Sequence, residues 1–346
     1  MSRLMNQQWR LAAHPEGLVK SSDFEWNEEP VPDLSMNKIL IRVIYLSIDP
    51  TIRGWMRPER TYMSPIKIGT VIRGIGLGIV EASKNSKFQK GDIVTGLLGW
   101  QRYLVSDGKG WLSKIERLEN VSLTAFLNPF GMIGLTAYFG LLEIGKPKER
   151  EVLVVSAGAG AVGSLVGQIG KIKGCKVIGI AGSEEKCRWI TEKLGFDGAV
   201  NYKAESVRKR LRELCPDGID IFFDNVGGSI LDSALANLGK NARIVICGFI
   251  SQYNDKKPRF ELTCFGNVLF KRATMRGFIV SDYFERTGKA LADLQRWYRE
   301  GRLQYREEVI IGLKNAPQAL AKLFEGSNRG KMIVKVSDDT VESNKT

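Results

Sequence analysis

Residues 151–186 read EVLVVSAGAGAVGSLVGQIGKIKGCKVIGIAGSEEK, and this stretch decides the fold of the chain. An apolar run, Val152–Val155, leads into a glycine-rich turn with the spacing GxGxxG at Gly158–Gly163. A segment with helical periodicity follows, and then a second apolar run, Val177–Ile180. This order predicts a strand, a glycine turn, a helix and a second strand.

The glycines of this turn have a chemical explanation. A pyrophosphate can approach the backbone closely where a strand becomes a helix only if no side chain blocks it, and the free N–H groups of the helix attract anionic oxygens. The turn therefore predicts a dinucleotide site. A packing role alone is the alternative, since a chain with 37 glycines forms some such turns by chance. The flanking strand and helix patterns favour the dinucleotide.

The residues after the second strand favour NADP over NAD. In NAD-dependent dehydrogenases an acidic residue about 20 positions beyond the glycines holds the ribose 2′-hydroxyl. Here the strand ends in the uncharged residues Ala181–Ser183, and Lys186 and Arg188 follow shortly after. Glu184 and Glu185 count against this preference. We interpret both as acids of a first helical turn that point to solvent.

Length and composition are typical of a globular chain with two domains. The chain has 346 residues, of which 43% are hydrophobic and 26% charged. Its cysteines are odd in number and form no CxxC pair, which favours reduced thiols over a disulfide framework. They are Cys175, Cys187, Cys215, Cys247 and Cys264. The first residues lack the apolar core of a signal peptide, so we expect a cytoplasmic protein.

Two other classes of partner are not expected. The uncharged stretches 121–142 and 152–170 reach membrane length, but glycines interrupt both, so we expect no membrane span. The net charge is +13, and the basic residues concentrate in short stretches between Lys203 and Arg306. Since no aromatic-basic recognition motif accompanies this charge, we expect no specific nucleic-acid binding. An RNA-binding or scaffold role is a distant alternative.

The first part of the chain reads as β-rich. Short β-branched runs separated by turn residues predict a small barrel or sandwich. The expected strands are Ile39–Tyr45, Gly69–Ile72, Gly76–Glu81 and Asp92–Leu98.

The pattern changes near Asn128 to alternating strands and helices, which predicts a parallel sheet with right-handed crossovers. The expected strands are Val152–Ser156, Lys176–Ala181, Ile219–Asp224, Ala242–Cys247 and Thr274–Phe278, and the expected helices Gly163–Lys173, Lys186–Leu194, Ser206–Leu214 and Ser229–Leu238. An amphipathic stretch, a helix near Ala316–Phe324 and a last strand, Met332–Val336, follow. That strand is expected to return to the first domain.

Several motifs together are similar to one family. They are LSIDPTIRGWM (46–56), IGLTAYFGLLEIGKPK (133–148), AGAVGSLVGQIGKIKGCKV (159–177), IDIFFDNVGG (219–228), CGFISQYN (247–254), RGFIV (276–280) and GSNRGKMIVKV (326–336). The chain resembles the zinc-independent medium-chain dehydrogenase/reductases, in the branch of NADPH-dependent alkenal, prostaglandin and bacterial curcumin reductases.

The resemblance implies an α/β fold with two domains. A Rossmann-type doubly wound parallel sheet would bind NADP(H) at residues 130–303. A β-rich GroES-like domain, formed by residues 1–129 and 304–346, would bind the substrate. The family also implies a homodimer, formed by pairing edge strands of the nucleotide domains.

The resemblance further implies which residues hold the cofactor. Gly160, Ala161, Val162 and Gly163 would hold the pyrophosphate, and Gly182, Ser183, Lys186 and Tyr202 the region of the 2′-phosphate. The ribose and nicotinamide would be lined by Thr136, Asn225, Cys247, Gly248, Phe249, Ile250, Tyr253, Phe278, Ile279, Val280 and Asn328. Taken alone, Asn225 is equally explained as a turn cap, Cys247 as a buried strand end and Phe278 as core packing.

The missing residues bear on the chemistry. A catalytic zinc site needs converging cysteine and histidine ligands, but the chain has one histidine, His14, and no cysteine before Cys175. We therefore expect no metal, and the same histidine count disfavours a Ser-His-Asp hydrolase. An α,β-unsaturated ketone or aldehyde can accept hydride at its β-carbon without a metal if a hydroxyl stabilises the enolate. We expect Tyr253, together with the ribose 2′-hydroxyl, to hold that oxygen, and Tyr62 is the second candidate.

One departure from the family affects the substrate pocket. Relatives usually carry Tyr in a DPYMRG motif, whereas residues 49–54 here read DPTIRG, with Thr51 at the tyrosine position. The change removes an aromatic wall and a phenol. A quinone reductase with the same hydride chemistry is the alternative function.

Overall fold

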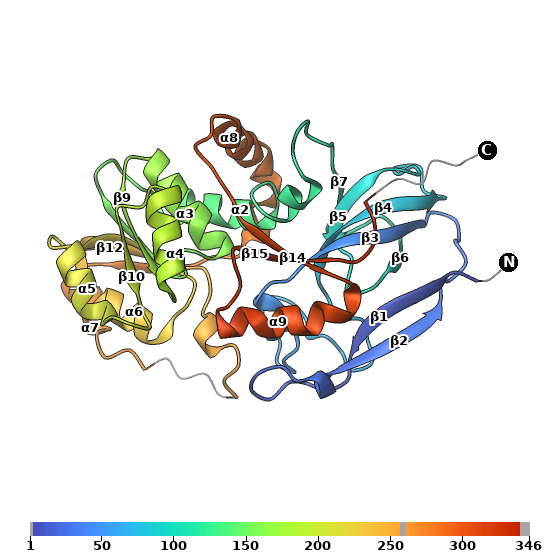
Figure 1. Cartoon of the computed structure of the whole chain (residues 1–346), viewed down its shortest axis with the longest axis horizontal. Coiled ribbons are helices and arrows are strands. Elements are labelled where there is room, and N and C mark those ends of the chain that lie inside the picture. The colour runs from blue at the N-terminus through green and yellow to red at the C-terminus, as the bar shows by residue number, and fades with distance from the viewer. Residues whose placement is uncertain (1–2, 257–260, 340–346) are drawn as a thin grey trace. The chain divides into compact units, whose positions relative to one another are not determined.

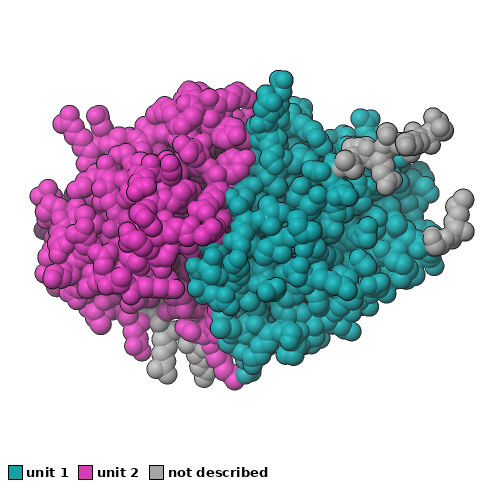
Figure 2. Space-filling view, viewed as in Figure 1, with its two compact units in different colours: residues 1–127, 307–328, 332–346 teal, residues 128–306, 329–331 magenta. Residues whose placement is uncertain are grey.

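The computed structural model describes residues 3–256 and 261–339, and it divides the chain into two compact units (Figure 2). Unit 1 comprises residues 1–127, 307–328 and 332–346, and unit 2 comprises residues 128–306 and 329–331. The boundaries expected from the sequence, 129/130 and 303/304, differ from these by a few residues. Residues 329–331 belong to unit 2 because Gly330 forms a bridge with Gly160 and the Lys331 N–H donates to the Arg306 carbonyl at 2.9 Å.

The sheet of unit 2 contains six strands in the order β10-β9-β8-β11-β12-β13, and every adjacent pair is parallel. Figure 1 labels three of them, β9, β10 and β12. The strands are β8 (Val152–Val155), β9 (Lys176–Ala181), β10 (Gly198–Asn201), β11 (Ile219–Asp224), β12 (Leu238–Ile246) and β13 (Thr274–Gly277). The strand order reverses between β8 and β11, which is the point where open parallel sheets bind ligands.

The helices of unit 2 connect these strands. They are α2 (Met132–Phe139), α3 (Ala161–Ile172), α4 (Glu184–Arg188), α5 (Val207–Leu214), α6 (Gly228–Leu235), α7 (Gly266–Phe270) and α8 (Thr287–Arg299). The parallel strands are apolar on both faces, as expected for a sheet that is covered on both sides. Val154, Ile178, Phe222 and Ile244 are paired in register and buried in one core. The next residues along these strands face the other side and are also fully buried: Val155, Phe223 and Val245. The sequence predicted five of the six strands. It missed β10, because Gly198–Asn201 is only four residues long and lacks a β-branched run.

Unit 1 contains a larger sheet in the order β14-β15-β3-β4-β5-β7, with β6 also paired to β3, and a separate β1-β2 hairpin. Its strands are β1 (Met5–Leu11), β2 (Phe24–Pro30), β3 (Ile39–Ser47), β4 (Ile75–Ser83), β5 (Ile93–Leu97), β6 (Tyr103–Ser106), β7 (Leu112–Lys114), β14 (Glu307–Ile311) and β15 (Lys331–Lys335). Two helices accompany them, α1 (Thr51–Trp55) and α9 (Ala316–Glu325). The return of the chain to this unit through β14 and β15 makes the unit discontinuous.

Two sequence expectations for unit 1 failed. Gly69–Ile72 is not a strand, since only Val71 forms a bridge, to Arg10, and Gly69 has a left-handed φ of 79°. The β1-β2 hairpin was missed because polar residues face its buried side: Asn6 and Gln8 are 7% and 1% exposed. A strand that buries amides shows no apolar alternation for a sequence pattern to detect.

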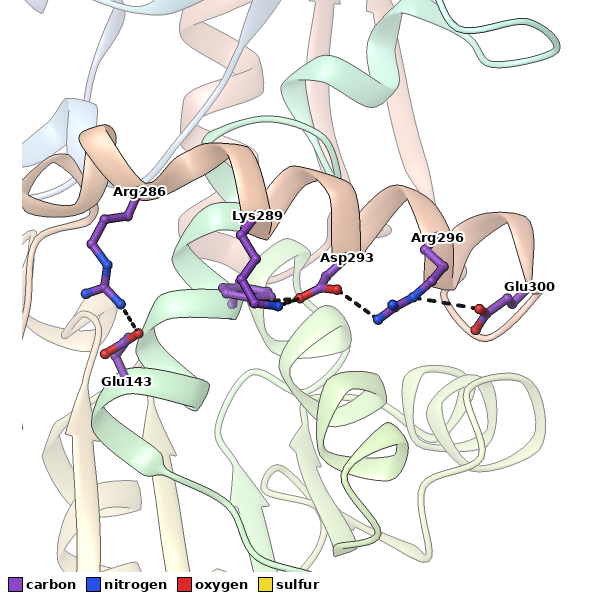
Figure 3. Close-up of polar contacts among 7 residues, drawn as sticks. Glu143, Arg286, Lys289, Asp293, Arg296 and Glu300 are labelled. Carbon is purple, nitrogen blue, oxygen red and sulfur yellow. Dashed lines mark hydrogen bonds and ion pairs between the residues drawn. The ribbon is translucent and has the colours of Figure 1, made fainter.

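In unit 2, a buried carboxylate, that of Asp293, joins α8 to α2 (Figure 3). The Tyr138 hydroxyl of α2 donates to Asp293 of α8 at 2.8 Å, and Lys289 and Arg296 each approach the same carboxylate at 2.8 Å. Burial alone would raise the pKa of Asp293, but the hydrogen bonds from Lys289 and Tyr138 and the neighbouring cations lower it. The Tyr138 pKa rises to about 12, from burial and from the hydrogen bond to Asp293.

These contacts predict a pH-dependent contribution to stability. A depressed folded-state pKa stabilises the fold above the unfolded value of about 3.8, and this stabilisation is lost as the pH falls below that value. Asp293→Asn should lower the free energy of unfolding at pH 7 by about 1–3 kcal/mol. Denaturant titrations of the variant and of wild type should begin to converge near pH 4 and should coincide only once the pH has fallen through the lowered folded-state pKa of Asp293. Glu300→Gln, at the end of the same helix, is the control, and an equal loss in both variants would contradict the special role of Asp293.

Candidate functional site

The glycine turn leaves the start of α3 open. Gly160 precedes the helix in extended conformation, no side chain caps the helix, and its first turn contains no acidic residue. A Cβ added at Gly163 would lie 2.2 Å from the Ala157 carbonyl oxygen, and one at Gly158 would lie 3.1 Å from the Gly179 Cα. These glycines therefore let α3 start directly against the strands. The N–H groups of Ala161, Val162 and Gly163 belong to this first turn, where an anionic group is stabilised.

The contacts of the glycines support the packing explanation, and they leave the start of α3 open for a ligand. Gly163 is required by its contact with Ala157, whereas a Cβ at Gly160 would meet nothing closer than 3.0 Å. The close fit brings a helix start that no side chain caps to the switch point of the sheet. The residues present thus fit the pyrophosphate of a dinucleotide.

The end of β9 forms a second part of the site. A Cβ at Gly182 would lie 2.9 Å from the Tyr202 ring, so the tyrosine lies flat against the Gly182 backbone, with 42% of its surface exposed. Ser183 caps α4 by accepting a hydrogen bond from the Lys186 N–H at 3.3 Å. Tyr202 and the first turn of α4 therefore flank the same uncharged strand end, as expected for a site that accepts a 2′-phosphate.

Glu185 lies in the first turn of α4, as interpreted from the sequence, and half of its side chain is exposed, but it does not simply point to solvent. Its carboxylate forms ion pairs with Arg329 at 2.9 Å and Arg306 at 3.5 Å. The sequence could not reveal this contact, because the two arginines lie more than a hundred residues away along the chain.

The sequence also missed a buried carboxylate at the switch point. Asp224, at the end of β11, is 1% exposed and accepts hydrogen bonds from the Ser156 hydroxyl at 2.7 Å and from the N–H groups of Val226 and Gly227 at 3.0 Å. Burial raises the pKa of Asp224, although these hydrogen bonds oppose the shift. The sequence signal is an acid that ends the apolar run Ile221–Phe223.

Asn225 is held by the same network. Its N–H donates to the Ser156 hydroxyl at 2.8 Å, and its side-chain amide donates to the Ser156 carbonyl at 2.8 Å. The residue therefore links the ends of β8 and β11 and is more than a local turn cap. Asp224 and Ser156 position it at the ligand-binding edge of the sheet.

The loop after β12 is tied to this edge as well. The N–H groups of Cys247 and Gly248 donate to the Asp224 carbonyl at 2.8 and 3.1 Å, and that of Ile250 donates to the Asn225 carbonyl at 3.2 Å. Burial and the nearby Asp224 carboxylate raise the pKa of the Cys247 thiol to about 12. The Cys247 thiol is therefore neutral at physiological pH.

Tyr253 ends this loop. Its ring packs edge-on against Phe249, with centroids 4.9 Å apart, and a Cβ at Gly248 would lie 3.2 Å from the Tyr253 hydroxyl. The phenol thus folds back over the backbone that follows β12. Five predicted site residues come together in this loop: Cys247, Gly248, Phe249, Ile250 and Tyr253.

The segment after β13 combines packing and lining. A Cβ at Gly140 would lie 2.5 Å from the Phe278 ring, which also contacts Phe223 edge-on at 6.5 Å. Phe278 therefore packs inside unit 2, which agrees with the alternative explanation of this residue as core packing. Ile279 and Val280 follow it and are half-buried. Thr136 lies on α2, where its hydroxyl donates to the Met132 carbonyl at 2.7 Å.

Two predicted residues belong to unit 1. Asn328 directly precedes the segment 329–331 that joins unit 2. Tyr62 lies next to α1, and its hydroxyl is 2.5 Å from the Thr51 hydroxyl and accepts a hydrogen bond from the Trp55 indole at 3.0 Å. Burial raises the pKa of the Tyr62 phenol. The position where relatives carry a tyrosine thus holds a threonine that binds another tyrosine.

The described part of the chain contains neither a cluster of metal ligands nor a helix that could cross a membrane. Among residues 3–256 and 261–339, no three or more His, Cys, Asp or Glu side chains are grouped to hold a metal ion. The His14 ring nitrogen is 2.7 Å from the Met56 carbonyl oxygen. In the same residue ranges, no helix has both the length and the apolar character to cross a bilayer.

The chain matches two family descriptions and several known proteins. Residues 7–114 match the N-terminal domain of oxidoreductase, and residues 161–296 match the zinc-binding dehydrogenase family. The chain is 41% identical over 343 residues to the NADPH-dependent curcumin reductase of Escherichia coli (strain K12), which covers 96% of this chain and 98% of the relative. It is 42% identical over 340 residues to the 2-alkenal reductase (NADP(+)-dependent) of Nicotiana tabacum, with the same coverage.

A solved structure agrees with these relatives. CurA from Vibrio vulnificus in complex with NADPH matches with a TM-score of 0.91 and 42% identity, over 96% of this chain and 99% of that chain. Likeness at this level extends through both units.

The Asp224 network generates a prediction. An asparagine can accept hydrogen bonds on one atom only, so Asp224→Asn should place an N–H group against the Gly227 N–H and lower the free energy of unfolding by about 1–3 kcal/mol. Chemical denaturation measures this loss. Asp220→Asn, on the same strand, is the matched control, because Asp220 accepts the Val152 N–H with a single oxygen and an amide can replace it. Equal stability of the two variants would contradict the assigned network.

Proposed function

Because this chain belongs to the medium-chain dehydrogenase/reductase family, in the branch of NADPH-dependent alkenal, prostaglandin and curcumin reductases, we propose that it reduces the carbon–carbon double bond of α,β-unsaturated ketones or aldehydes without a metal ion. The chain is an NADP(H)-dependent oxidoreductase. The observation that carries the proposal is the identity of 41% to a curcumin reductase over 96% of the chain.

The geometry of unit 2 supports the cofactor assignment. Gly160–Gly163 would hold the pyrophosphate at the open start of α3, and Lys186 and Tyr202 the 2′-phosphate beside Gly182 and Ser183. Thr136, Asn225, the loop Cys247–Tyr253, Phe278–Val280 and Asn328 would hold the ribose and the nicotinamide. When bound, NADPH supplies the hydride that an electrophilic β-carbon can accept.

Tyr253 is the proposed donor to the substrate oxygen. Hydride addition at the β-carbon leaves an enolate, whose negative charge is stabilised by a preorganised hydroxyl donor. The Tyr253 hydroxyl is held over Gly248 by the ring contact with Phe249. Because this loop is hydrogen-bonded to Asp224 and Asn225, the phenol keeps its place without rearrangement of the backbone.

Tyr62 is the second candidate, and Thr51 gives it a defined orientation. The Trp55 N–H donates to the Tyr62 oxygen. If the Thr51 hydroxyl also donates to that oxygen, the Tyr62 proton is left to point toward a substrate. In that arrangement Thr51, which replaces the tyrosine expected from the family, orients the phenol of Tyr62.

A substrate screen tests the proposal. NADPH oxidation should be observed with enones and enals and be slow with simple ketones. Tyr253→Phe should lower kcat by roughly a hundredfold, because one enolate donor is lost, with little change in NADPH affinity. Tyr62→Phe is compared in parallel, and unchanged turnover in either variant removes that tyrosine from the donor role.

Faster turnover of quinones than of enones would favour the alternative, an NADPH:quinone oxidoreductase. Salt-dependent nucleic-acid retention without NADPH turnover would favour the distant alternative, an RNA-binding or scaffold role. Neither alternative is supported by a specific contact among the described residues.

We propose that the protein is cytoplasmic. Its five cysteines are free thiols, which supports this proposal.

We also propose a homodimer through the β13 edge of unit 2. β13 is the terminal strand of its sheet, and α7 with the residue before it exposes three large apolar side chains: Phe265 at 56%, Leu269 at 76% and Phe270 at 67%. A free strand edge beside exposed apolar groups is suited to pairing with a second copy.

This interface predicts a change of mass in solution. Leu269→Asp should convert a dimer to a monomer, because a buried charge without a partner opposes association. Light scattering coupled to gel filtration measures the mass. Ile311→Asp, at an exposed apolar residue of unit 1, is the control. A wild-type monomer, or an Leu269→Asp dimer, would contradict the proposed interface.

A further inference from the structure

Three charged side chains from separate segments meet beside the glycine turn of unit 2. Glu185 comes from the first turn of α4, Arg306 from the end of the segment that follows α8, and Arg329 from the segment 329–331. One Glu185 oxygen lies 2.9 Å from the Arg329 guanidinium, and the other lies 3.5 Å from that of Arg306.

The backbones that carry the arginines are fixed at this place. Gln168 of α3 exchanges two hydrogen bonds with the backbone of Gln304, at 2.9 and 2.7 Å. Gly330 forms a bridge with Gly160, and a Cβ at Gly330 would lie 2.1 Å from the Arg306 carbonyl oxygen. Arg329 therefore directly precedes Gly330, the residue that contacts the glycine turn before α3.

Stability alone does not account for this arrangement. The side chains of Glu185, Arg306 and Arg329 are 51%, 33% and 57% exposed, and ion pairs with this exposure contribute little to folding. Arginine is, however, the residue best suited to bind phosphate, through paired N–H donors. Glu185 lies two residues after Ser183. Gly182 and Ser183 form the uncharged end of β9, where the sequence predicts the 2′-phosphate of NADP(H).

The charge balance points the same way. Unit 2 contains 30 Lys and Arg against 19 Asp and Glu, a net charge of +11, whereas unit 1 contains 21 against 19, a net charge of +2. Glu185 lies among these cations and competes with a phosphate for Arg306 and Arg329. It also keeps the arginines extended toward the phosphate-binding edge while no ligand is bound.

We propose that Arg329, supported by Arg306, binds a phosphate of NADP(H), and that Glu185 is an internal anion that occupies these arginines until the dinucleotide replaces it. The inference rests on the proposed function, because it concerns the same cofactor. Its consequence is that the two partners of one ion pair affect cofactor affinity in opposite directions. Loss of Arg329 removes a phosphate ligand, and loss of the Glu185 charge removes a competitor.

Binding titrations on the full chain test this directly. NADPH fluorescence and calorimetry with adenosine 2′,5′-bisphosphate and NADH give dissociation constants without turnover. Arg329→Gln should weaken NADPH binding by about tenfold, the change expected for one charge-assisted phosphate contact. Glu185→Gln should tighten NADPH binding by about threefold. The cofactor then no longer has to break the ion pairs of Glu185, and the gain is small because exposed ion pairs are weak. A larger effect on NADPH than on NADH would assign the contact to the 2′-phosphate, and equal effects would assign it to the pyrophosphate.

Matched controls separate this role from a general charge effect. Glu184→Gln removes the same charge from the same turn of α4, and Arg302→Gln removes an arginine that pairs with Glu300. Both should leave NADPH affinity within about twofold of wild type, since exposed charges at a distance are screened. Thermal unfolding of each variant confirms that it is folded.

The inference is overturned if wild type binds NADPH and both Glu185→Gln and Arg329→Gln leave the dissociation constant unchanged, or if both weaken it. The ion pair would then be structural only. Failure of the wild-type chain to bind NADPH would overturn the proposed function as well.

Discussion

The close approach of α3 to the sheet is the constraint on which the site depends. A Cβ at Gly163 would collide with the Ala157 carbonyl, and one at Gly158 would press on Gly179. Without these contacts the helix could not begin where β8 ends, and its open N–H groups would not lie at the point where the strand order reverses. The dinucleotide-binding character of unit 2 is therefore a consequence of backbone packing.

Asp224 extends this constraint to the neighbouring strands. The carboxylate and backbone carbonyl of this residue together receive hydrogen bonds from Ser156, Val226, Gly227, Cys247 and Gly248, which belong to three different strand ends. A buried acid with all its partners satisfied holds these loops in one arrangement, because breaking any contact leaves a polar group unpaired. The loop with Tyr253 is held in place by the same bonds.

Electrostatics divides the chain unevenly. Almost all of the net charge of +13 resides in unit 2, which contains the expected phosphate sites. A phosphate-rich cofactor benefits from such a field, and an internal acid such as Glu185 limits its strength at one edge. In unit 1 a buried polar contact joins two segments: Arg53 of α1 is buried and donates to the carbonyls of Pro15 and Gly17, which ties the loop between β1 and β2 to α1.

The sequence by itself determined the strand-turn-helix unit at residues 152–181, the parallel order of the following elements and the uncharged end of β9. These features are local, since periodicity and glycine spacing act over a few residues. Only the tertiary structure decided the partners of Glu185, the network around Asp224, the hydrogen bond between Thr51 and Tyr62, and the hairpin that buries Asn6 and Gln8. Each joins residues that local patterns cannot relate, because a hydrogen bond or ion pair depends on distance in space and not on separation along the chain.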